Sequence, residues 1–263
     1  MTSSGHGSAA WFVRPRPRPD AALRLFCFSH AGGAASSYFP WSAALADVDV
    51  LAVQLPGREG RLSEPPIDDA DALVGRLADV LSPWLDRPFV FFGHSMGAYL
   101  AFETARALRR RALPQPRRLI VSGRRAPTMA EGEAPLHALP DAELVAELNR
   151  RFGGLPAVIL AEPELMALFL PIIRADLRLL ERAVFRPEPP LALPISAFGG
   201  ADDARADLAA MTGWRDLTAG GFDARKFPGG HFYLHERRDD FLPTLASVLA
   251  SERAGLPQRA DAV

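Results

Sequence analysis

The sequence predicts an α/β fold in which helices cover both faces of a mostly parallel central sheet, with an all-helical insertion. Two observations predict it. Short apolar runs alternate with helical patterns along most of the chain, as is typical of parallel strands buried on both sides. One long segment carries helical patterns only. With 263 residues, the chain is long enough for one large domain of this class.

Six apolar runs of strand length form the predicted sheet, and helical patterns separate them. The strands are expected over residues 23–28, 48–53, 88–92, 118–122, 193–198 and, more weakly, 222–227. Helices are expected over residues 36–46, 70–85, 98–111 and 240–251. Residues 1–22 contain a run of alternating arginine and proline, so we expect a flexible, extended lead-in. Residues 256–263 are expected to form a C-terminal tail.

The all-helical insertion is expected over residues 135–185, between core segments 23–134 and 186–255. Its predicted helices cover residues 141–152 and 162–183, and Pro171 should kink or divide the second. Apolar side chains of that helix recur at helical spacing: Leu165, Leu168, Phe169, Ile172, Ile173, Leu177 and Leu180. Such apolar faces suit an acyl chain, so we predict a lid over a site. Ordinary helices packed on the core are the alternative.

Composition excludes several classes of protein. The formal net charge of −1 gives no overall attraction to nucleic acid or an anionic membrane. No stretch of 18 uncharged apolar residues occurs, and the N-terminus is polar and glycine-rich, so a cytoplasmic protein is expected. The single cysteine, Cys27, cannot form an internal disulfide and is expected to pack in the core.

The most informative motif is Gly-His-Ser-Met-Gly at residues 93–97. It follows a predicted strand and leads into a predicted helix, which is the context of a nucleophile elbow. Glycine suits the positions two residues before and after Ser95 because the turn is tight. The N-terminus of the following helix favours a developing negative charge. A chance match to a common pattern is the alternative, but this context favours a serine hydrolase.

A serine nucleophile needs a histidine base and a carboxylate that orients it. We favour His231, which follows the last strand in a Pro-Gly-Gly-His loop, over His235 one helical turn later. The remaining histidines are less well placed. They are His6 in the lead-in, His30 before a glycine pair, His94 pointing away from the serine and His137 at the edge of the insertion.

The carboxylate is expected in the Gly-Gly-Ala-Asp-Asp turn at residues 199–203, after the penultimate strand. Asp202 is chosen for its spacing from Gly199, which leaves Asp203 as a cap for a helix over residues 204–210. The order Ser95, Asp202, His231 is that of the α/β-hydrolase fold.

An oxyanion hole needs two backbone donors. The Met96 N–H directly follows the nucleophile. The second donor is expected from the loop after the first core strand, where we choose the Ala31 N–H, with the Gly32 N–H as the alternative.

Four segments together resemble a known family. They are Phe-Ser-His-Ala-Gly-Gly at 28–33, Gln-Leu-Pro-Gly-Arg-Glu at 54–59, Phe-Gly-His-Ser-Met-Gly-Ala at 92–98 and Pro-Gly-Gly-His-Phe-Tyr-Leu at 228–234. As a set they resemble the type II, or editing, thioesterases of polyketide synthase and non-ribosomal peptide synthetase systems, in the α/β-hydrolase superfamily. Two departures occur. Ser29 stands where the family often has proline, and the acid loop differs from the family's more usual Gly-Asp-x-Asp-Pro.

The resemblance implies a free-standing cytoplasmic enzyme of antibiotic biosynthesis. It would remove aberrant or stalled acyl groups from the phosphopantetheine arm of an acyl or peptidyl carrier protein, with no cofactor or metal of its own. Because carrier proteins are usually acidic, arginines on nearby loops are candidates for docking: Arg58, Arg61, Arg124 and Arg125. Ordinary solvated arginines are the alternative. We expect a monomer with no nucleic-acid or membrane partner.

Three other functions share parts of this pattern. A general carboxylesterase or lipase would have the same fold and triad. A terminal thioesterase would release or cyclise a finished product. A non-catalytic protein of the same fold would only bind an acyl group or a partner, which the intact Ser, Asp and His argue against.

Overall fold

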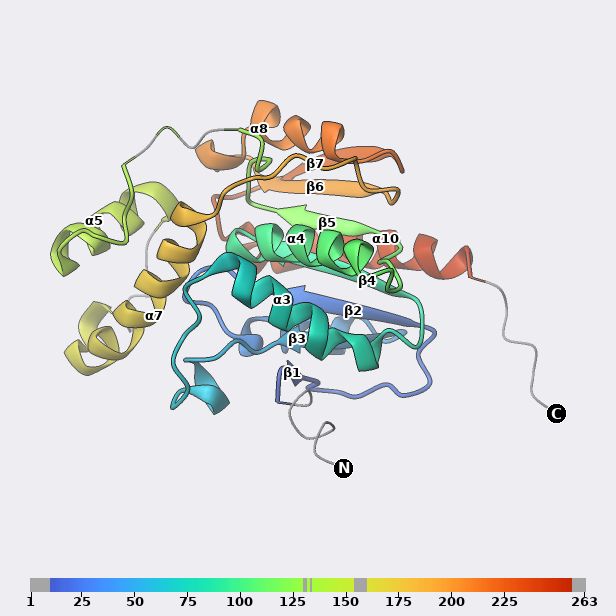
Figure 1. Cartoon of the computed structure of the whole chain (residues 1–263), viewed down its shortest axis with the longest axis horizontal. Helices are drawn as coiled ribbons and strands as arrows, with labels where there is room; N and C mark the ends of the chain where they lie inside the picture. The colour runs from blue at the N-terminus through green and yellow to red at the C-terminus, as the bar shows by residue number, and fades with distance from the viewer. Residues whose placement is uncertain (1–9, 130–131, 133, 154–159, 257–263) are drawn as a thin grey trace.

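One seven-stranded sheet organises the chain, in the order β1-β3-β2-β4-β5-β6-β7 (Figure 1). The computed structural model describes residues 10–256, apart from 130, 131, 133 and 154–159. The strands are β1 Phe12–Val13, β2 Leu23–Phe28, β3 Val48–Val53, β4 Phe89–His94, β5 Leu119–Ser122, β6 Ile195–Gly200 and β7 Phe222–Phe227. Every neighbouring pair is parallel except β1–β3. The predicted mostly parallel sheet is confirmed.

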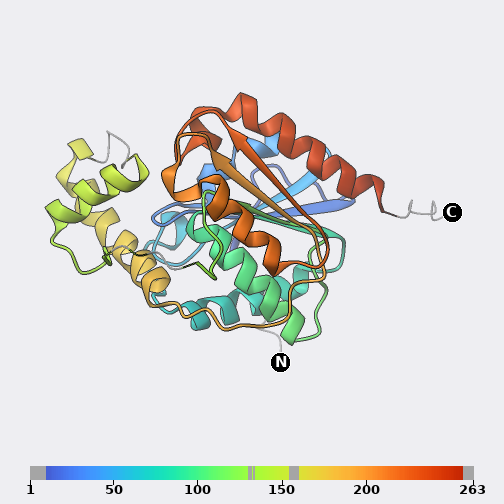
Figure 2. The ribbon, with the colours of Figure 1, turned by 90° about the horizontal axis from the view of Figure 1, so that it is seen from above.

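Helices cover both faces of this sheet (Figure 2). The α-helices are α2 Trp41–Ala44, α3 Ala70–Leu81, α4 Met96–Arg110, α5 Asp141–Phe152, α7 Pro163–Arg182, α8 Leu208–Thr212, α9 Tyr233–Glu236 and α10 Arg238–Ala254. Side chains of α3, α4 and α8 share one hydrophobic cluster, and those of α2, α9 and α10 share a second. The strands, apolar on both faces, are buried between these two clusters.

Two helices that adjoin or contain a proline differ from their predictions. The helix expected over residues 36–46 is a 3-10 turn, Ala35–Tyr38, followed by α2, and Pro40 lies at the junction. Its ring removes a backbone donor that a continuous helix would use. By contrast, α7 runs unbroken through Pro171, so the expected division does not occur. Leu170 and Ile172 on either side of it are buried, and their packing offsets the lost hydrogen bond.

The N-terminal segment is more ordered than the sequence suggested. Within the expected lead-in, β1 pairs antiparallel with β3, and Trp11 and Phe12 are buried. Phe12 makes edge-to-face contacts with Phe26 and Trp84. The prediction of a flexible lead-in is therefore wrong for this part, because apolar area on an edge strand offsets the entropy of ordering it. Residues 1–9 and 257–263 of the expected lead-in and tail lie outside the described residues.

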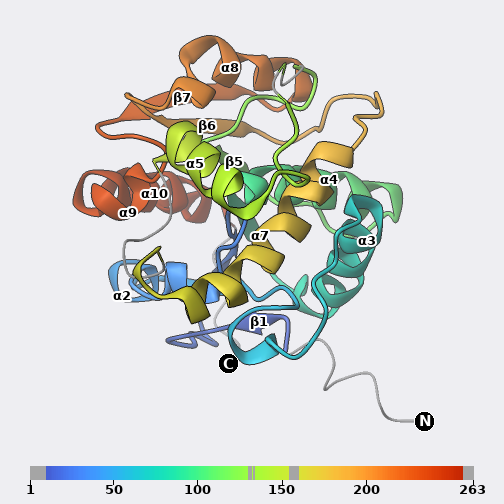
Figure 3. The ribbon, with the colours of Figure 1, turned by 90° about the vertical axis from the view of Figure 1, so that its left-hand side faces the viewer.

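Helices α5 and α7 lie beyond the carboxyl ends of the parallel strands (Figures 1 and 3). They follow β5 and precede β6, in the segment where the insertion was expected. They share a third hydrophobic cluster made of Leu136, Leu144, Leu148, Leu170, Ile173 and Leu177. A pair of helices with its own small core therefore covers the edge of the sheet where α/β proteins bind ligands.

No helix in the described part of the chain is long and apolar enough to cross a membrane.

Candidate active site

Ser95 lies at the sharp junction of β4 and α4. Its backbone has φ 55° and ψ −112°, a conformation that non-glycine residues seldom adopt and that stores strain at functional sites. The Ser95 N–H donates to the Ser122 carbonyl oxygen at 2.8 Å, so the neighbouring strand holds the turn in place. The residue is buried, with 9% of its surface exposed. A strained, supported serine at a strand-to-helix turn is a nucleophile elbow.

The flanking glycines are required by close backbone contacts. A Cβ on Gly93 would lie 2.0 Å from the Gly97 carbonyl oxygen, and one on Gly97 would lie 2.0 Å from the Phe28 carbonyl oxygen. Both obstacles are backbone atoms, so no side-chain rotation relieves the clash. The absence of both side chains lets α4 begin directly against β2 and β4. Met96 is the first residue of α4, where backbone N–H groups have no helical partner.

His231 lies in the loop between β7 and α9, and its partner is Asp203. The His231 Nδ1 and Asp203 Oδ2 atoms are 2.8 Å apart, and both side chains are buried. A carboxylate only accepts hydrogen bonds, so Nδ1 carries a proton, and in the neutral form of the ring Nε2 then has a free lone pair. Burial raises the pKa of Asp203, but the hydrogen bond and charge of His231 and the Arg205 N–H outweigh it, leaving the pKa below its ordinary value. Asp203 is therefore ionised at neutral pH.

The choice of Asp202 as the partner of the histidine is wrong. Strand β6 continues to Gly200, two residues beyond its predicted end. Ala201 and Asp202 then form a turn in which the Asp203 N–H donates to the Gly200 carbonyl oxygen at 3.3 Å. After this turn Asp203 has φ −83° and ψ 100° and is buried, whereas Asp202 in the turn is exposed. Asp203 also accepts a hydrogen bond from the Arg205 N–H. One aspartate thus caps the following 3-10 turn and contacts His231.

Three further histidines surround this pair. The ring centroids of His94 and His231 are 4.9 Å apart, and those of His30 and His235 are 6.0 Å apart. Burial, then the nearby His235, His231 and Arg58, lowers the pKa of His30 to about 3. Burial also lowers the pKa of His94 and of His235. These rings are neutral at pH 7, and the structure pairs His231, not His235, with the carboxylate.

His94 belongs to a buried hydrogen-bond chain behind the elbow. Its Nδ1 lies 2.9 Å from the Ser122 hydroxyl, which lies 2.8 Å from the Tyr233 hydroxyl. Ser122 therefore contacts the site twice, through its carbonyl to Ser95 and through its hydroxyl to His94. This chain fixes the ring that packs against His231.

The expected oxyanion loop forms a tight turn over residues 30–33. The Gly33 N–H donates to the His30 carbonyl oxygen at 2.9 Å, and Gly32 has φ +75°. The Gly32 N–H donates to Asp176 Oδ2 at 2.7 Å. The alternative donor, the Gly32 N–H, is thus already engaged by Asp176. Ala31 and Gly32 both line the same cavity as Ser95.

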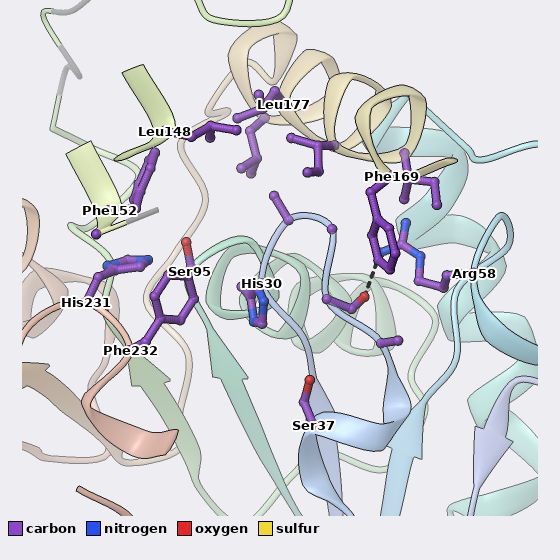
Figure 4. A pocket seen from close by; sticks show the side chains of 18 of the residues that line it. His30, Ser37, Arg58, Ser95, Leu148, Phe152, Phe169, Leu177, His231 and Phe232 are labelled. Atoms are coloured by element: carbon purple, nitrogen blue, oxygen red, sulfur yellow. Dashed lines mark hydrogen bonds between the residues drawn. The ribbon is translucent and has the colours of Figure 1, made fainter. Parts of the chain in front are cut away.

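A cavity of about 830 Å³ joins these groups. Ser95 and His231 lie on one side of it, and side chains from α5 and α7 close it from above (Figure 4). Its apolar wall includes Leu148, Phe152, Phe169 and Leu177. The arrangement places a serine, a histidine–carboxylate pair and a helix N-terminus at one end of an apolar chamber.

Two arginines predicted to dock a partner are buried instead. Arg58 has 4% of its surface exposed and forms a forked ion pair with Asp176 on α7, at 3.0 and 2.8 Å. Arg61 has 8% exposed, pairs with Glu64 and lies over the Trp11 ring. The docking prediction is therefore wrong for both. Asp176 was missed, although a carboxylate within the apolar stripe of a helix is a signal of a buried partner.

Among the residues that the structure describes, no group of three or more His, Cys, Asp or Glu side chains is placed to hold a metal ion.

The fold and site define a serine hydrolase of the α/β-hydrolase class, and comparison with known proteins gives the family. A thioesterase domain model matches residues 23–249, so the chain belongs to the thioesterase family. Its relatives include type II thioesterases. The type II thioesterase BorB from the borrelidin biosynthetic cluster superposes with a TM-score of 0.82 at 40% identity, covering 95% of this chain and 100% of BorB.

Two further relatives come from natural-product pathways. RedJ, a thioesterase from the prodiginine biosynthetic pathway in Streptomyces coelicolor, superposes with a TM-score of 0.81 at 42% identity, covering 94% of this chain and 96% of RedJ. The gramicidin S biosynthesis protein GrsT of Aneurinibacillus migulanus is 36% identical over 240 residues, 91% of this chain and 93% of GrsT. The predicted membership of this family is confirmed.

Proposed function

We propose that this protein hydrolyses acyl thioesters carried on the phosphopantetheine arm of acyl or peptidyl carrier proteins, and that it serves to clear aberrant or stalled acyl groups. Family membership supports thioester hydrolysis, and the biosynthetic setting of BorB, RedJ and GrsT supports the carrier-bound substrate. The observation that carries the proposal is the His231–Asp203 pair, which lies with Ser95 at one end of an apolar chamber.

In the proposed reaction, Ser95 is the nucleophile. His231 Nε2 takes the hydroxyl proton while the Ser95 oxygen attacks the thioester carbonyl carbon. Asp203 holds the ring in the required tautomer and stabilises the imidazolium that forms. The carbonyl oxygen becomes an oxyanion and accepts hydrogen bonds from the Met96 and Ala31 N–H groups.

Collapse of the tetrahedral intermediate breaks the carbon–sulfur bond. His231 gives its proton to the departing pantetheine thiolate, and the acyl group stays on Ser95 as an ester. His231 then removes a proton from water, which attacks the ester carbonyl carbon. The bond to the Ser95 oxygen breaks, His231 returns the proton to that oxygen, and the acid is released. The cycle needs no cofactor, because the phosphopantetheine belongs to the substrate.

The chamber is proposed to receive the acyl group. Its wall from α5 and α7 carries leucine, isoleucine and phenylalanine side chains, which favour an apolar chain over water. The two helices therefore act as a lid that excludes water from the acyl-enzyme, except for the water that completes the reaction.

The test is release of a propionyl group from a holo carrier protein by the wild type and by Ser95→Ala. Propionyl pantetheine thioester and a matched oxygen ester are assayed in parallel. Faster release from the carrier, abolished by the substitution, is the expected result. Equal or better turnover of the oxygen ester with no carrier advantage would instead indicate a general esterase. Trapping of only a long, finished product on Ser95 would indicate a terminal thioesterase.

A further inference from the structure

The turn over residues 30–33 carries the proposed Ala31 donor and has one conformational freedom. With φ +75° at Gly32 and a hydrogen bond from Gly33 to His30, it is a type II β-turn. Type I and type II turns differ in the orientation of the peptide between their two central residues, here Ala31 and Gly32. Glycine reaches both forms, so the turn needs an outside contact to keep one of them.

Asp176 and Arg58 supply that contact. Asp176 Oδ2 accepts the Gly32 N–H at 2.7 Å, and this N–H belongs to the peptide that differs between the two turn types. Arg58 Nη1 donates to the Gly33 carbonyl oxygen at 2.9 Å. The carboxylate and the guanidinium are joined by two hydrogen bonds, and both are almost fully buried. The ion pair thus forms hydrogen bonds with two consecutive residues of the turn, Gly32 and Gly33.

The same helix, α7, also packs closely against the turn. A Cβ on Gly32 would lie 2.7 Å from Ile173 Cγ1, so α7 packs directly on the turn. Ile173 lies three residues before Asp176, on the same side of the helix. The helix that walls the acyl chamber therefore contacts the oxyanion loop through one apolar and one charged side chain.

We propose that Asp176 is a positioning residue: with Arg58, it holds the 30–33 turn in its type II form and anchors it to α7, and so fixes the position of the Ala31 N–H beside the oxyanion. This inference rests on the proposed function. It assigns the ion pair a role in transition-state stabilisation, in addition to fastening α7. The position of the acyl-chamber wall and the geometry of the oxyanion hole are then coupled through one carboxylate.

Single substitutions would leave a buried charge without its partner, which is strongly destabilising. The test therefore uses two neutral double variants. Arg58→Gln/Asp176→Asn keeps an acceptor for the Gly32 N–H. Arg58→Met/Asp176→Leu fills the same space with apolar groups and removes that acceptor. Replacing a buried ion pair by apolar groups is often neutral for stability, so both variants are expected to fold.

The measurements are kcat and KM for propionyl and longer acyl pantetheine thioesters, the melting temperature, and inhibition by an alkyl boronic acid. The boronate adds to the serine as a tetrahedral anion, so its affinity reports the oxyanion hole. The Met/Leu variant should lose at least 10-fold in kcat for every acyl group, toward the ~10²–10³ of a missing donor, and bind the boronate correspondingly more weakly. The Gln/Asn variant should retain most of both.

A matched control is Asp68→Asn. Asp68 forms an ion pair with Arg178, which also lies on α7, and both side chains of this pair are partly exposed. The substitution breaks this pair and leaves Asp176 untouched. It should leave kcat unchanged. Equal loss in both double variants, or a change confined to KM and acyl-length preference, would show that the pair only fastens α7 and would overturn the inference. Wild-type protein without Ser95-dependent thioester turnover would refute the proposed function, while the boronate affinities would still test the turn.

Discussion

Replacing Asp203 by asparagine should abolish most of the activity while leaving the protein folded. The asparagine Oδ1 can still accept the Arg205 N–H at the cap, so the local turn is preserved. Facing His231 Nδ1, however, the amide either donates, which forces the wrong tautomer, or accepts without a negative charge. A charge-assisted hydrogen bond contributes about 1.5–3 kcal/mol, and the tautomer adds to this loss. In serine hydrolases the combined cost reaches ~10⁴ in kcat, or about 5.4 kcal/mol at 1.36 kcal/mol per tenfold.

The matched control is Asp202→Asn, one residue away. Asp202 is exposed, and its backbone N–H, which donates to the Gly229 carbonyl oxygen, is unaffected by the substitution. Steady-state release of propionate from the pantetheine thioester should fall about 10³–10⁴-fold in Asp203→Asn and less than twofold in Asp202→Asn. Melting temperatures of both should stay close to wild type. The reverse ranking of the two variants would refute the assignment of Asp203 as the partner of His231.

Three further outcomes follow from contacts in the site. Gly97→Ala places a Cβ 2.0 Å from the Phe28 carbonyl oxygen and should destabilise by about 3 kcal/mol or more; a urea midpoint equal to wild type would contradict this. His30 is neutral when folded, with its pKa lowered to about 3, so its contribution is present above pH 6.5 and is lost as pH falls, by about 1.4 kcal/mol per pH unit. His30→Asn should reduce the slope of the unfolding free energy between pH 6.5 and 5, while His94 and His235, whose pKa values are also lowered, still contribute; an unchanged slope would count against it. Leu148→Phe narrows the cavity and should lower kcat/KM for octanoyl relative to propionyl thioesters by about tenfold; an unaltered ratio would mean that the acyl chain lies elsewhere.

The sequence by itself determined the sheet, the elbow and the loop of the base, because each depends on neighbours along the chain. Apolar runs of strand length and helical periodicity are local signals. The glycines at 93 and 97 are demanded by one tight turn, and their spacing from Ser95 is visible without a structure. His231 was separable from His235 because a Pro-Gly-Gly run ending a strand puts the next side chain at the carboxyl edge.

Only the tertiary structure decided which aspartate faces the histidine and where the arginines lie. Asp202 and Asp203 are adjacent, and which of them faces His231 depends on the turn that follows β6 and on its contact with the loop of His231. Gly200 lies so close to the loop of His231 that a Cβ would be 2.1 Å from the Gly230 carbonyl oxygen. Local propensity does not encode that approach.

The same reason explains the error at Arg58. An arginine on a loop has the character of a docking residue, and its ion-pair partner is not the adjacent Glu59. Its partner, Asp176, is 118 residues away on a helix of the insertion. The charge is buried because the fold brings a carboxylate to meet it, and burial of a guanidinium is tolerable only with such a partner. Pairings at that separation are set by packing of the whole chain, which the order of residues specifies but local patterns do not display.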